Sequence, residues 1–422
     1  MSRLQTIIRE IQQGKTLVAF LGLRMLGEGL TTVGPLVVAS RLSPATFGSY
    51  TLAKMVLFLF LALLVTPSQT PFIVLASQER QRDGTMNKTF SVQLAFFAAA
   101  LILFVLLTVA LRGPLTAFAE IGPTDLLFVS GGFIGIAVKI FLSSIFMATD
   151  RRVTSSLVEL VFGASNFLGI ILLSLAGRIT LQTVFATYLA ASALTVVLFA
   201  GSIDFRAFRP LVLDRACLRE MLAFTKWAVV AVVSVYFINS GDNLVLRYFV
   251  SMEEIGVYNL AYQVFKGVAT PALMLNAYFL PFVSQHVDTA EKMRIYLFNK
   301  RPKIVALGVA CIALLFTFAP SVLEPIYGDR YAETVVLLRV LLVGCVLALY
   351  GIFYEPILCA RKAYSFAQAV NIAQLSVNLG LDILLVPRWG ALGAAMGTVL
   401  GYLVRTLAME LYFRMKLKRA LD

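Results

Sequence analysis

Long apolar runs, separated by short charged or Pro/Gly-containing segments, repeat along the whole chain of 422 residues. A helix that crosses a bilayer needs about 20 mostly apolar residues, and each run reaches that length. The pattern predicts twelve helices, near residues 16–38, 47–75, 89–111, 125–148, 153–176, 180–202, 222–249, 255–284, 304–325, 334–358, 366–386 and 391–413. We therefore expect an all-α polytopic membrane protein.

The most polar stretch near the middle of the chain contains Arg206, Arg209, Arg215 and Arg219. Such a charged segment between apolar runs is typical of a connection that stays in water. We therefore expect three parts: an N-terminal lobe of six helices at 1–205, a cytoplasmic linker at 206–221, and a C-terminal lobe of six helices at 222–422.

An internal repeat supports two related halves. LSPATFGSYTLA at 42–53 aligns with VSMEEIGVYNLA at 250–261 at an offset of 208, with identities at Ser43/Ser251, Gly48/Gly256, Tyr50/Tyr258, Leu52/Leu260 and Ala53/Ala261. Both segments join the first and second helices of a half on the same side of the membrane. This predicts parallel repeats, two lobes related by an axis along the membrane normal, around a central cleft.

Composition agrees with a membrane protein and narrows the function. Apolar residues make up 59% of the chain and charged residues 14%, against about 45–50% and 25% in soluble domains. The four cysteines have no CxxC spacing and the one histidine is His286, so we expect no metal site. Walker, HExxH and GxSxG motifs are missing, and no outer connection exceeds about 15 residues by these spans. We expect a transporter without a cofactor, not an enzyme.

The formal net charge of +13 is explained by topology. The termini and the even-numbered connections hold 23 Lys and Arg residues, whereas the opposite connections hold five. Cytoplasmic loops carry such an excess, so both termini are expected in the cytoplasm. Nucleic-acid binding is not needed to explain the charge.

Eight basic residues fall inside the predicted helices, where a charge costs a few kcal/mol unless it meets a partner or water. We expect Lys226, Arg339 and Arg405 to snorkel or to form structural ion pairs. The other five are candidate substrate-binding cations of the cleft: Arg24, Lys54, Lys139, Arg247 and Lys266. Arg24 and Lys266 lie close to the expected bilayer midplane, where snorkelling is hardest.

Three intramembrane carboxylates are candidates for coupling to an ion gradient. Glu28 is one helical turn from Arg24 and faces the same side, so the two can neutralise each other. Glu159 is a partner for Lys139 on the preceding helix. Asp242 lies beside Ser240, Gly241 and Asn243 in a polar patch that indicates a partly unwound helix. Arg and Lys are the natural ligands of phosphate oxygens, so the favoured substrate is anionic.

Four segments carry a resemblance to a known family, and they occur in order at the expected helix junctions: RLSPATFGSYTLA at 41–53, GDNLVLRYFVSMEEIGVYNLAYQ at 241–263, EPIYGDRYAETVVLLRVLL at 324–342 and NLGLDILLVPRWGALGAAMGTVLGYLV at 378–404. In these segments the chain resembles the polysaccharide transporters, the Wzx-type oligosaccharide flippases of the MOP superfamily. That superfamily also contains MATE exporters and MurJ-type lipid II flippases.

The resemblance implies a multi-pass protein of the bacterial inner membrane that moves undecaprenyl-diphosphate-linked oligosaccharide by alternating access. The product would serve O-antigen (lipopolysaccharide), capsule or exopolysaccharide biosynthesis, with a polysaccharide polymerase and a chain-length regulator as partners. Energy would come from a proton or sodium gradient. Two alternatives remain open: a MATE-like drug exporter, for which cleft carboxylates and aromatic side chains are expected, and a membrane glycan polymerase or ligase, for which a longer outer loop is expected.

Overall fold

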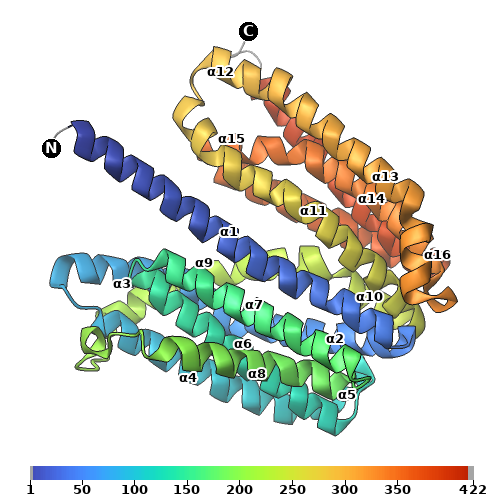
Figure 1. Cartoon of the computed structure of the whole chain (residues 1–422), viewed down its shortest axis with the longest axis horizontal. Helices are drawn as coiled ribbons and strands as arrows, with labels where there is room; N and C mark the ends of the chain where they lie inside the picture. The colour runs from blue at the N-terminus through green and yellow to red at the C-terminus, as the bar shows by residue number, and fades with distance from the viewer. Residues whose placement is uncertain (1–2, 417–422) are drawn as a thin grey trace. The chain divides into compact units, whose positions relative to one another are not determined.

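A computed structural model describes the backbone of residues 3–416, and their side chains except those of 3–18, 207, 273, 274, 277, 281, 364 and 416. This part of the chain contains helices and no strands. Its α-helices, labelled in Figure 1, are α1 (Arg3–Arg41), α2 (Pro44–Phe60), α3 (Gln69–Asp83), α4 (Asn87–Ala110), α5 (Arg112–Ala119), α6 (Pro123–Ala148), α7 (Arg152–Leu175), α8 (Leu181–Ala200), α9 (Arg215–Ser240), α10 (Asp242–Phe249), α11 (Met252–His286), α12 (Ala290–Ile295), α13 (Arg301–Tyr327), α14 (Glu333–Gly351), α15 (Glu355–Ala360) and α16 (Tyr364–Lys416).

All twelve expected spans coincide with helices in the structure, so the predicted all-α polytopic fold is confirmed. Nine helical runs of the described residues are long and apolar enough to cross a membrane, and they cover ten of the expected spans. α1 and α11 account for the other two. The run from Pro44 to Asp83 is interrupted by a π-helical turn at Leu61–Val65 and a 3-10 turn at Thr66–Ser68, which contains Pro67.

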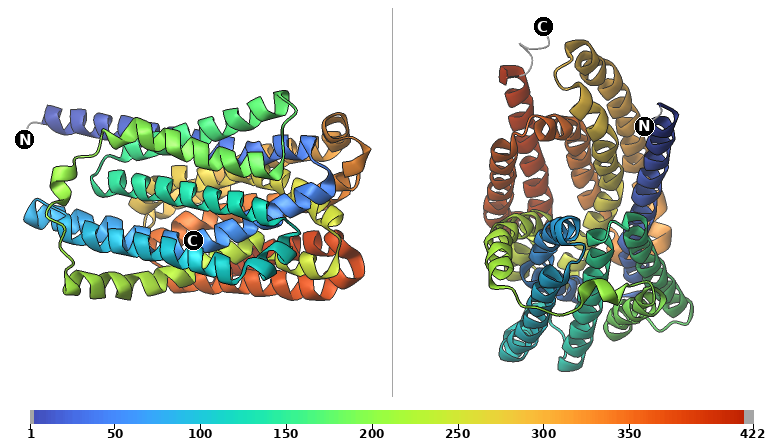
Figure 2. Two further views of the ribbon diagram at one scale, coloured as in Figure 1. Left: turned by 90° about the horizontal axis from the view of Figure 1, so that it is seen from below. Right: turned by 90° about the vertical axis from the view of Figure 1, so that its left-hand side faces the viewer.

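α16 consists of two helices that meet at Gly390, whose φ of 54° and ψ of -138° are not helical. The two halves lie antiparallel, because Gly393 packs against Leu385 and Gly401 against Gln374 (Figure 2). The φ of Gly390 favours glycine, and a Cβ there would lie 1.9 Å from Glu254 Oε1, so a larger residue would also displace the carboxylate that accepts a hydrogen bond from the Ala391 N–H. The turn therefore separates the expected spans 366–386 and 391–413.

The chain forms two compact units, which are described separately. Unit 1 contains residues 1–41 and 52–233, and unit 2 contains residues 42–51 and 234–422. Residues 206–221, the expected linker, lie within unit 1. α2 begins in unit 2 and continues in unit 1, since its residues up to Thr51 pack with unit 2.

In unit 1, α1 packs along α7, and α6, α7 and α8 pack against one another. The crossing of α1 and α7 is close because it is made by glycines. A Cβ on Gly27 would lie 2.6 Å from the Glu159 carbonyl oxygen, and one on Gly163 would lie 2.3 Å from that of Gly27. Small residues allow such approach between membrane helices, and here they bring Glu159 beside α1.

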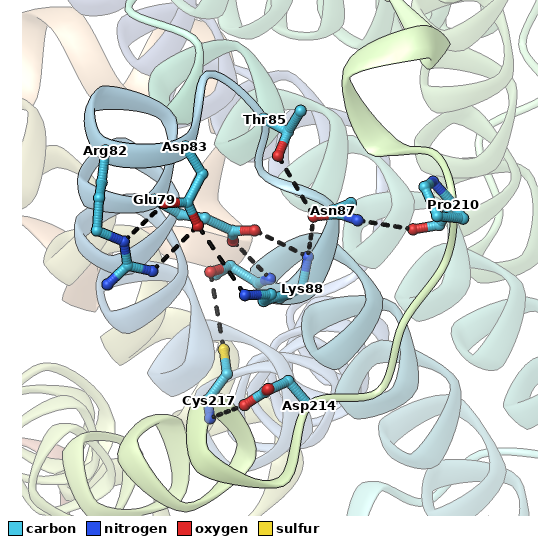
Figure 3. A network of polar contacts seen from close by, with 10 residues as sticks. Glu79, Arg82, Asp83, Thr85, Asn87, Lys88, Pro210, Asp214 and Cys217 are labelled. Atoms are coloured by element: carbon cyan, nitrogen blue, oxygen red, sulfur yellow. Dashed lines mark hydrogen bonds and ion pairs between the residues drawn. The ribbon is translucent and has the colours of Figure 1, made fainter.

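Polar contacts fix the segment before α9 to the start of α4 (Figure 3). The buried Glu79 accepts hydrogen bonds from the backbone N–H groups of Lys88 and Thr89, at 3.0 and 2.8 Å. The Asn87 side chain donates to the Pro210 carbonyl at 3.1 Å, and the Cys217 thiol donates to the Thr89 hydroxyl at 3.7 Å. Below them an apolar cluster includes Phe208 and Met221, so the segment expected to link two lobes is an integral part of unit 1.

In unit 2, α14 packs between α11, α13 and α16, while α10 packs against α16. One apolar cluster of this unit includes Phe279, Tyr296, Phe353 and Met409. α11 starts at a hydrogen-bonded N-cap, because the Ser251 hydroxyl accepts from the Glu254 N–H at 3.3 Å.

Candidate substrate and coupling sites

The first pair of site residues lies on α1, in the half of the helix whose side chains are described. Arg24 Nε donates to Glu28 Oε1 at 3.0 Å, as the one-turn spacing predicts. Their side chains are 43% and 60% exposed. The Glu28 carbonyl in turn accepts from the Thr31 and Thr32 hydroxyls. In the described contacts only one of the three guanidinium nitrogens is used, so Arg24 is held in place while two nitrogens remain available to an anion.

The second pair joins α6 and α7. Lys139 Nζ lies 2.7 Å from Glu159 Oε2, and the side chains are only 10% and 15% exposed. The ammonium also lies 5.0 Å from the centroid of the Phe162 ring. The predicted partnership is confirmed, and its burial shows a pair that neutralises itself. Lys139 is therefore less accessible to a substrate than Arg24.

Lys266 of α11 lies in a different setting. Its ammonium donates to the Asn239 carbonyl at 3.3 Å and lies 4.7 Å from the centroid of the Tyr262 ring. Within the part of the chain that the structure describes, no carboxylate forms an ion pair with it. A carbonyl and a ring face stabilise a cation without neutralising it, so neither of these partners takes the place of an anionic ligand at Lys266.

Lys54 and Arg247 complete the predicted cations. Lys54 is half-buried on α2, with its ammonium 5.9 Å from the centroid of the Phe58 ring. Arg247 is half-buried on α10. Unit 1 thus holds Arg24, Lys54 and Lys139, and unit 2 holds Arg247 and Lys266. That these five residues bind substrate is a prediction.

Arg405 was expected to snorkel or to form a structural pair, and the structure shows the pair. Its guanidinium contacts the Glu355 carboxylate and donates to Gln374 Oε1 at 2.9 Å. The Asn276 amide donates to the other oxygen of Glu355. This network joins α11, α15 and α16 and leaves little of Arg405 for another ligand.

Asp242, the first residue of α10, lies in a buried polar cluster. It is 3% exposed, and its Oδ2 accepts hydrogen bonds from the Tyr258 hydroxyl and, at 2.9 Å, from the Thr398 hydroxyl. The predicted unwinding is limited to an interruption between α9 and α10, since Gly241 keeps right-handed helical angles of φ -61° and ψ -35°. Asp242 is therefore aimed into the protein from a helix start.

A second carboxylate, Asp382 of α16, lies beside Asp242 and is fully buried. No donor group of the described residues reaches Oδ1 of Asp242, either oxygen of Asp382, or Oδ1 of Asn378 one turn earlier. Gly397 on the facing half of α16 leaves room for Asp382, because a Cβ there would lie 2.2 Å from Asp382 Oδ1. The cluster thus combines four buried acceptor oxygens, and among the described residues no ion pair to Asp242 or Asp382 neutralises them.

Sequence reasoning did not assign Asp382, Asn378 or Thr398. The available signal was an aspartate inside a predicted span, with an amide one helical turn away in the segment NLGLD at 378–382. Buried carboxylates without donors need a proton or a bound cation, and oxygen ligands suit either. The described residues contain no group of three or more His, Cys, Asp or Glu side chains placed to hold a metal ion.

Comparison with known proteins finds a matching family model and a similar protein. Residues 136–336 match the family model described as Polysaccharide biosynthesis protein. A relative from Haloferax volcanii, named as a probable low-salt glycan biosynthesis flippase, is 21% identical over 191 residues. The match covers 45% of this chain and 40% of that relative, so it spans about two fifths of the relative's own length.

Two solved structures have the same fold. An inward-facing multidrug resistance transporter of the MATE family superposes with a TM-score of 0.73 over 96% of this chain and 98% of its own, at 16% identity. The lipid II flippase MurJ in an inward closed conformation gives a TM-score of 0.74 over 96% of this chain and 88% of its own, at 15% identity. The predicted resemblance to polysaccharide transporters is therefore supported by the family model over residues 136–336, and the fold is shared with these two transporters.

Proposed function

We propose that this membrane protein is a flippase for lipid-linked oligosaccharides, with undecaprenyl-diphosphate-linked repeat units as substrate. The family match, the flippase relative and the fold shared with the lipid II flippase support this proposal. Its physical basis is the presence in each unit of a cation that is not fully neutralised, Arg24 in unit 1 and Lys266 in unit 2.

A diphosphate suits these cations because charge-assisted hydrogen bonds to phosphate oxygens are stronger than neutral ones. Arg24 would offer two guanidinium nitrogens, and Lys266 an ammonium whose present partners are a carbonyl and a ring. The glycan would cross in water while the polyprenyl chain stays in lipid, since transferring that chain to water would cost about 0.8 kcal/mol for each CH₂ group. Alternation between inward and outward openings would complete the transfer.

The coupling ion would bind at Asp242 and Asp382. Glu28 and Glu159 already pair with Arg24 and Lys139, whereas the two aspartates are buried beside each other and form no ion pair with the described residues. A proton shared by the two carboxylates, or a sodium ion bound by their oxygens together with Asn378, would remove the repulsion between them. We therefore propose Asp242 as the coupling residue among the three predicted carboxylates.

The proposed setting is a bacterial inner membrane with both termini in the cytoplasm. There the protein would act with a polysaccharide polymerase and a chain-length regulator in the synthesis of O-antigen, capsule or exopolysaccharide. The distribution of 23 against five basic residues supports the orientation.

Proteoliposomes test the function directly. A fluorescent undecaprenyl-diphosphate oligosaccharide is placed in one leaflet, and its arrival in the other is followed with a membrane-impermeant quencher. The proposal predicts movement that depends on the protein. Movement no faster than in empty vesicles, combined with gradient-driven export of an organic cation, would instead identify a drug exporter of the kind found among its structural neighbours.

A further inference from the structure

The segment between α8 and α9 is held against unit 1 by one of its faces. Phe208 is buried, and its ring stacks on that of Phe90 in α4, with the centroids 4.1 Å apart. The Val212 N–H donates to the Ser91 hydroxyl at 2.9 Å, next to the Pro210 contact drawn in Figure 3. These contacts fix the backbone, so the side chains on the other face have defined positions.

The other face exposes large apolar side chains. Phe205, Leu211 and Leu213 are each more than half exposed, as are Val197 near the end of α8 and Leu222 near the start of α9. In a membrane protein, such positions on helices face acyl chains. An irregular backbone stays out of the hydrocarbon core, because its polar groups would lose water there. The segment therefore lies at the membrane interface, and only its side chains reach the acyl chains.

The same segment carries four exposed cations: Arg206, Arg209, Arg215 and Arg219. Within the part of the chain that the structure describes, none of these guanidinium groups forms an ion pair or donates a hydrogen bond. Neighbouring arginines of unit 1 are engaged instead: Arg80 donates to the Thr149 carbonyl at 2.6 Å, and Arg151 to the Ser202 carbonyl at 2.5 Å. The four cations of residues 206–219 thus face the surroundings of the protein.

Two aspartates in this region are occupied by backbone groups. Asp204 Oδ1 accepts from the Arg206 N–H at 3.1 Å, and Asp214 Oδ1 accepts from the Cys217 N–H at 2.8 Å. Both carboxylates therefore stabilise the start of a helical turn, as capping residues do. The exposed face keeps its positive charge beside its apolar side chains.

An anionic phospholipid is the partner that matches both features. Guanidinium groups bind phosphate oxygens through charge-assisted hydrogen bonds. Segments that combine exposed apolar side chains with basic ones lie on membrane surfaces, and cytoplasmic leaflets are rich in anionic lipids. A soluble acidic protein or a nucleic acid would contact the arginines only, and would leave Phe205, Leu211 and Leu213 in water.

We propose that residues 205–219 bind anionic phospholipids, with the arginines on the headgroup phosphates and the three apolar side chains among the acyl chains. All side chains of α9 are described, and the only buried one is that of Met221, which lies in the same apolar cluster as Phe208. The bound lipid would therefore help to hold the start of α9. This lipid belongs to the surrounding leaflet and is not the lipid-linked oligosaccharide that the protein is proposed to carry.

Quenching of a single tryptophan tests the surface in the full-length protein in phosphatidylcholine nanodiscs. Trp227 and Trp389, both more than half exposed, are replaced by Phe, and Leu211→Trp places an indole on the apolar face. Brominated acyl chains quench an indole that they contact. A small fraction of brominated phosphatidylglycerol should quench this indole strongly, whereas the same fraction of brominated phosphatidylcholine should quench it weakly.

Arg209→Gln combined with Arg215→Gln should raise the mole fraction of brominated phosphatidylglycerol needed for half quenching by roughly 25-fold, because each arginine near an anionic leaflet contributes about a fivefold factor. The matched control combines Arg152→Gln with Arg414→Gln. It removes the same charge from exposed arginines that already form ion pairs with carboxylates, at 2.9 and 2.7 Å. The control should keep the parent value.

Three results would overturn the proposal. Equal quenching by the two brominated lipids would show no preference for an anionic headgroup. Equal shifts in the two double variants would indicate attraction by net charge alone. Quenching by aqueous iodide and by neither lipid would place the apolar face in water, open to a soluble partner. Leu213→Trp repeats the measurement from a second exposed position. The measurement uses no oligosaccharide substrate, so a failure of translocation leaves it intact.

Discussion

Individual charged residues differ in what their surroundings allow them to do. Arg24 and Glu28 form an exposed pair on one helix, of a kind that contributes about 0.3–0.5 kcal/mol. Lys139 and Glu159 form a largely buried pair between two helices, and removing one member of such a pair leaves a charge without compensation. The same residue types therefore serve different purposes in the same unit.

This difference predicts that removing the cation of each pair changes stability by very different amounts. Lys139→Ala should lower the free energy of unfolding by about 3 kcal/mol, because Glu159 would remain buried and unpaired. Arg24→Ala should change it by less than about 0.5 kcal/mol. Thermal unfolding in detergent measures both, and Lys139→Ala combined with Glu159→Ala should recover most of the loss. If Arg24→Ala destabilised as much as Lys139→Ala, the distinction between the two pairs would be wrong.

The aspartate pair gives a second prediction at this scale. A cation that binds the folded state raises the melting temperature as its concentration rises. Sodium at fixed pH should stabilise the protein if it is the coupling ion, and Asp382→Asn should remove that response. A response to pH in sodium-free buffer that Asp382→Asn also removes would indicate a proton instead. Asp204→Asn, outside the cluster, should leave either response unchanged, and an unchanged response in Asp382→Asn would exclude this site.

How much of the site could be predicted depends on how far apart along the chain the contacting residues lie. The Arg24–Glu28 pair follows from helical spacing, and the Lys139–Glu159 pair from neighbouring helices. The partners of Asp242 lie 16, 140 and 156 residues away, at Tyr258, Asp382 and Thr398. No periodicity in the sequence relates such positions, because their meeting depends on how α10, α11 and α16 pack.

At the scale of helices, glycine decides where two backbones meet. At two helix crossings, direct backbone contact replaces the packing of side chains. One crossing is made by Gly27 and Gly163, and the other by Gly48 and Gly256. The repeat could be found in the sequence because both copies keep the glycine, but the contact between the copies could not. Similarity of two segments implies similar structure for each of them and says nothing of whether they touch.

The turn within α16 gives a prediction about the stability of a helix-to-helix turn. Gly390 has a φ of 54° and faces Glu254, whereas Gly177 has a φ of 65° and open space around it. Gly177→Ala should therefore cost about 1 kcal/mol of left-handed strain, and Gly390→Ala about 2 kcal/mol, because the Glu254 carboxylate must also move and its hydrogen bond from the Ala391 N–H is lost. Melting temperatures of the two variants make the comparison, and equal losses would show that the contact with Glu254 contributes nothing.

At the scale of the whole molecule, hydropathy alone was sufficient to predict where the membrane-spanning helices lie. Every expected helix is present because a bilayer admits few other structures for apolar segments of this length. The interruptions within these helices could not be predicted in the same way. The π-helical turn at Leu61–Val65, for example, has the same apolar composition as the helix before it. The packing of neighbouring helices, and not the local composition, determines where such π-helical turns form.

Orientation is also a property of the whole chain and remains to be measured. The excess of basic residues on one side predicts cytoplasmic termini. A fluorescent protein fused after Asp422 should therefore fluoresce in bacterial cells, and alkaline phosphatase fused at Arg178 should be active. Phosphatase activity at the C-terminal fusion, with a dark fluorescent fusion, would reverse the assignment.

The central claim is that cations inside the membrane that are not fully neutralised, Arg24 and Lys266, bind the diphosphate of a lipid-linked oligosaccharide. The most direct measurement is the translocation rate of labelled undecaprenyl-diphosphate oligosaccharide in proteoliposomes with parent protein, Lys266→Ala, Lys266→Arg and Lys226→Ala. Loss of a charge-assisted contact of about 1.5–3 kcal/mol predicts a fall of roughly ten- to hundredfold for Lys266→Ala, with a smaller fall for Lys266→Arg and none for Lys226→Ala. Equal rates for all four proteins, each monodisperse and correctly inserted, would contradict the account.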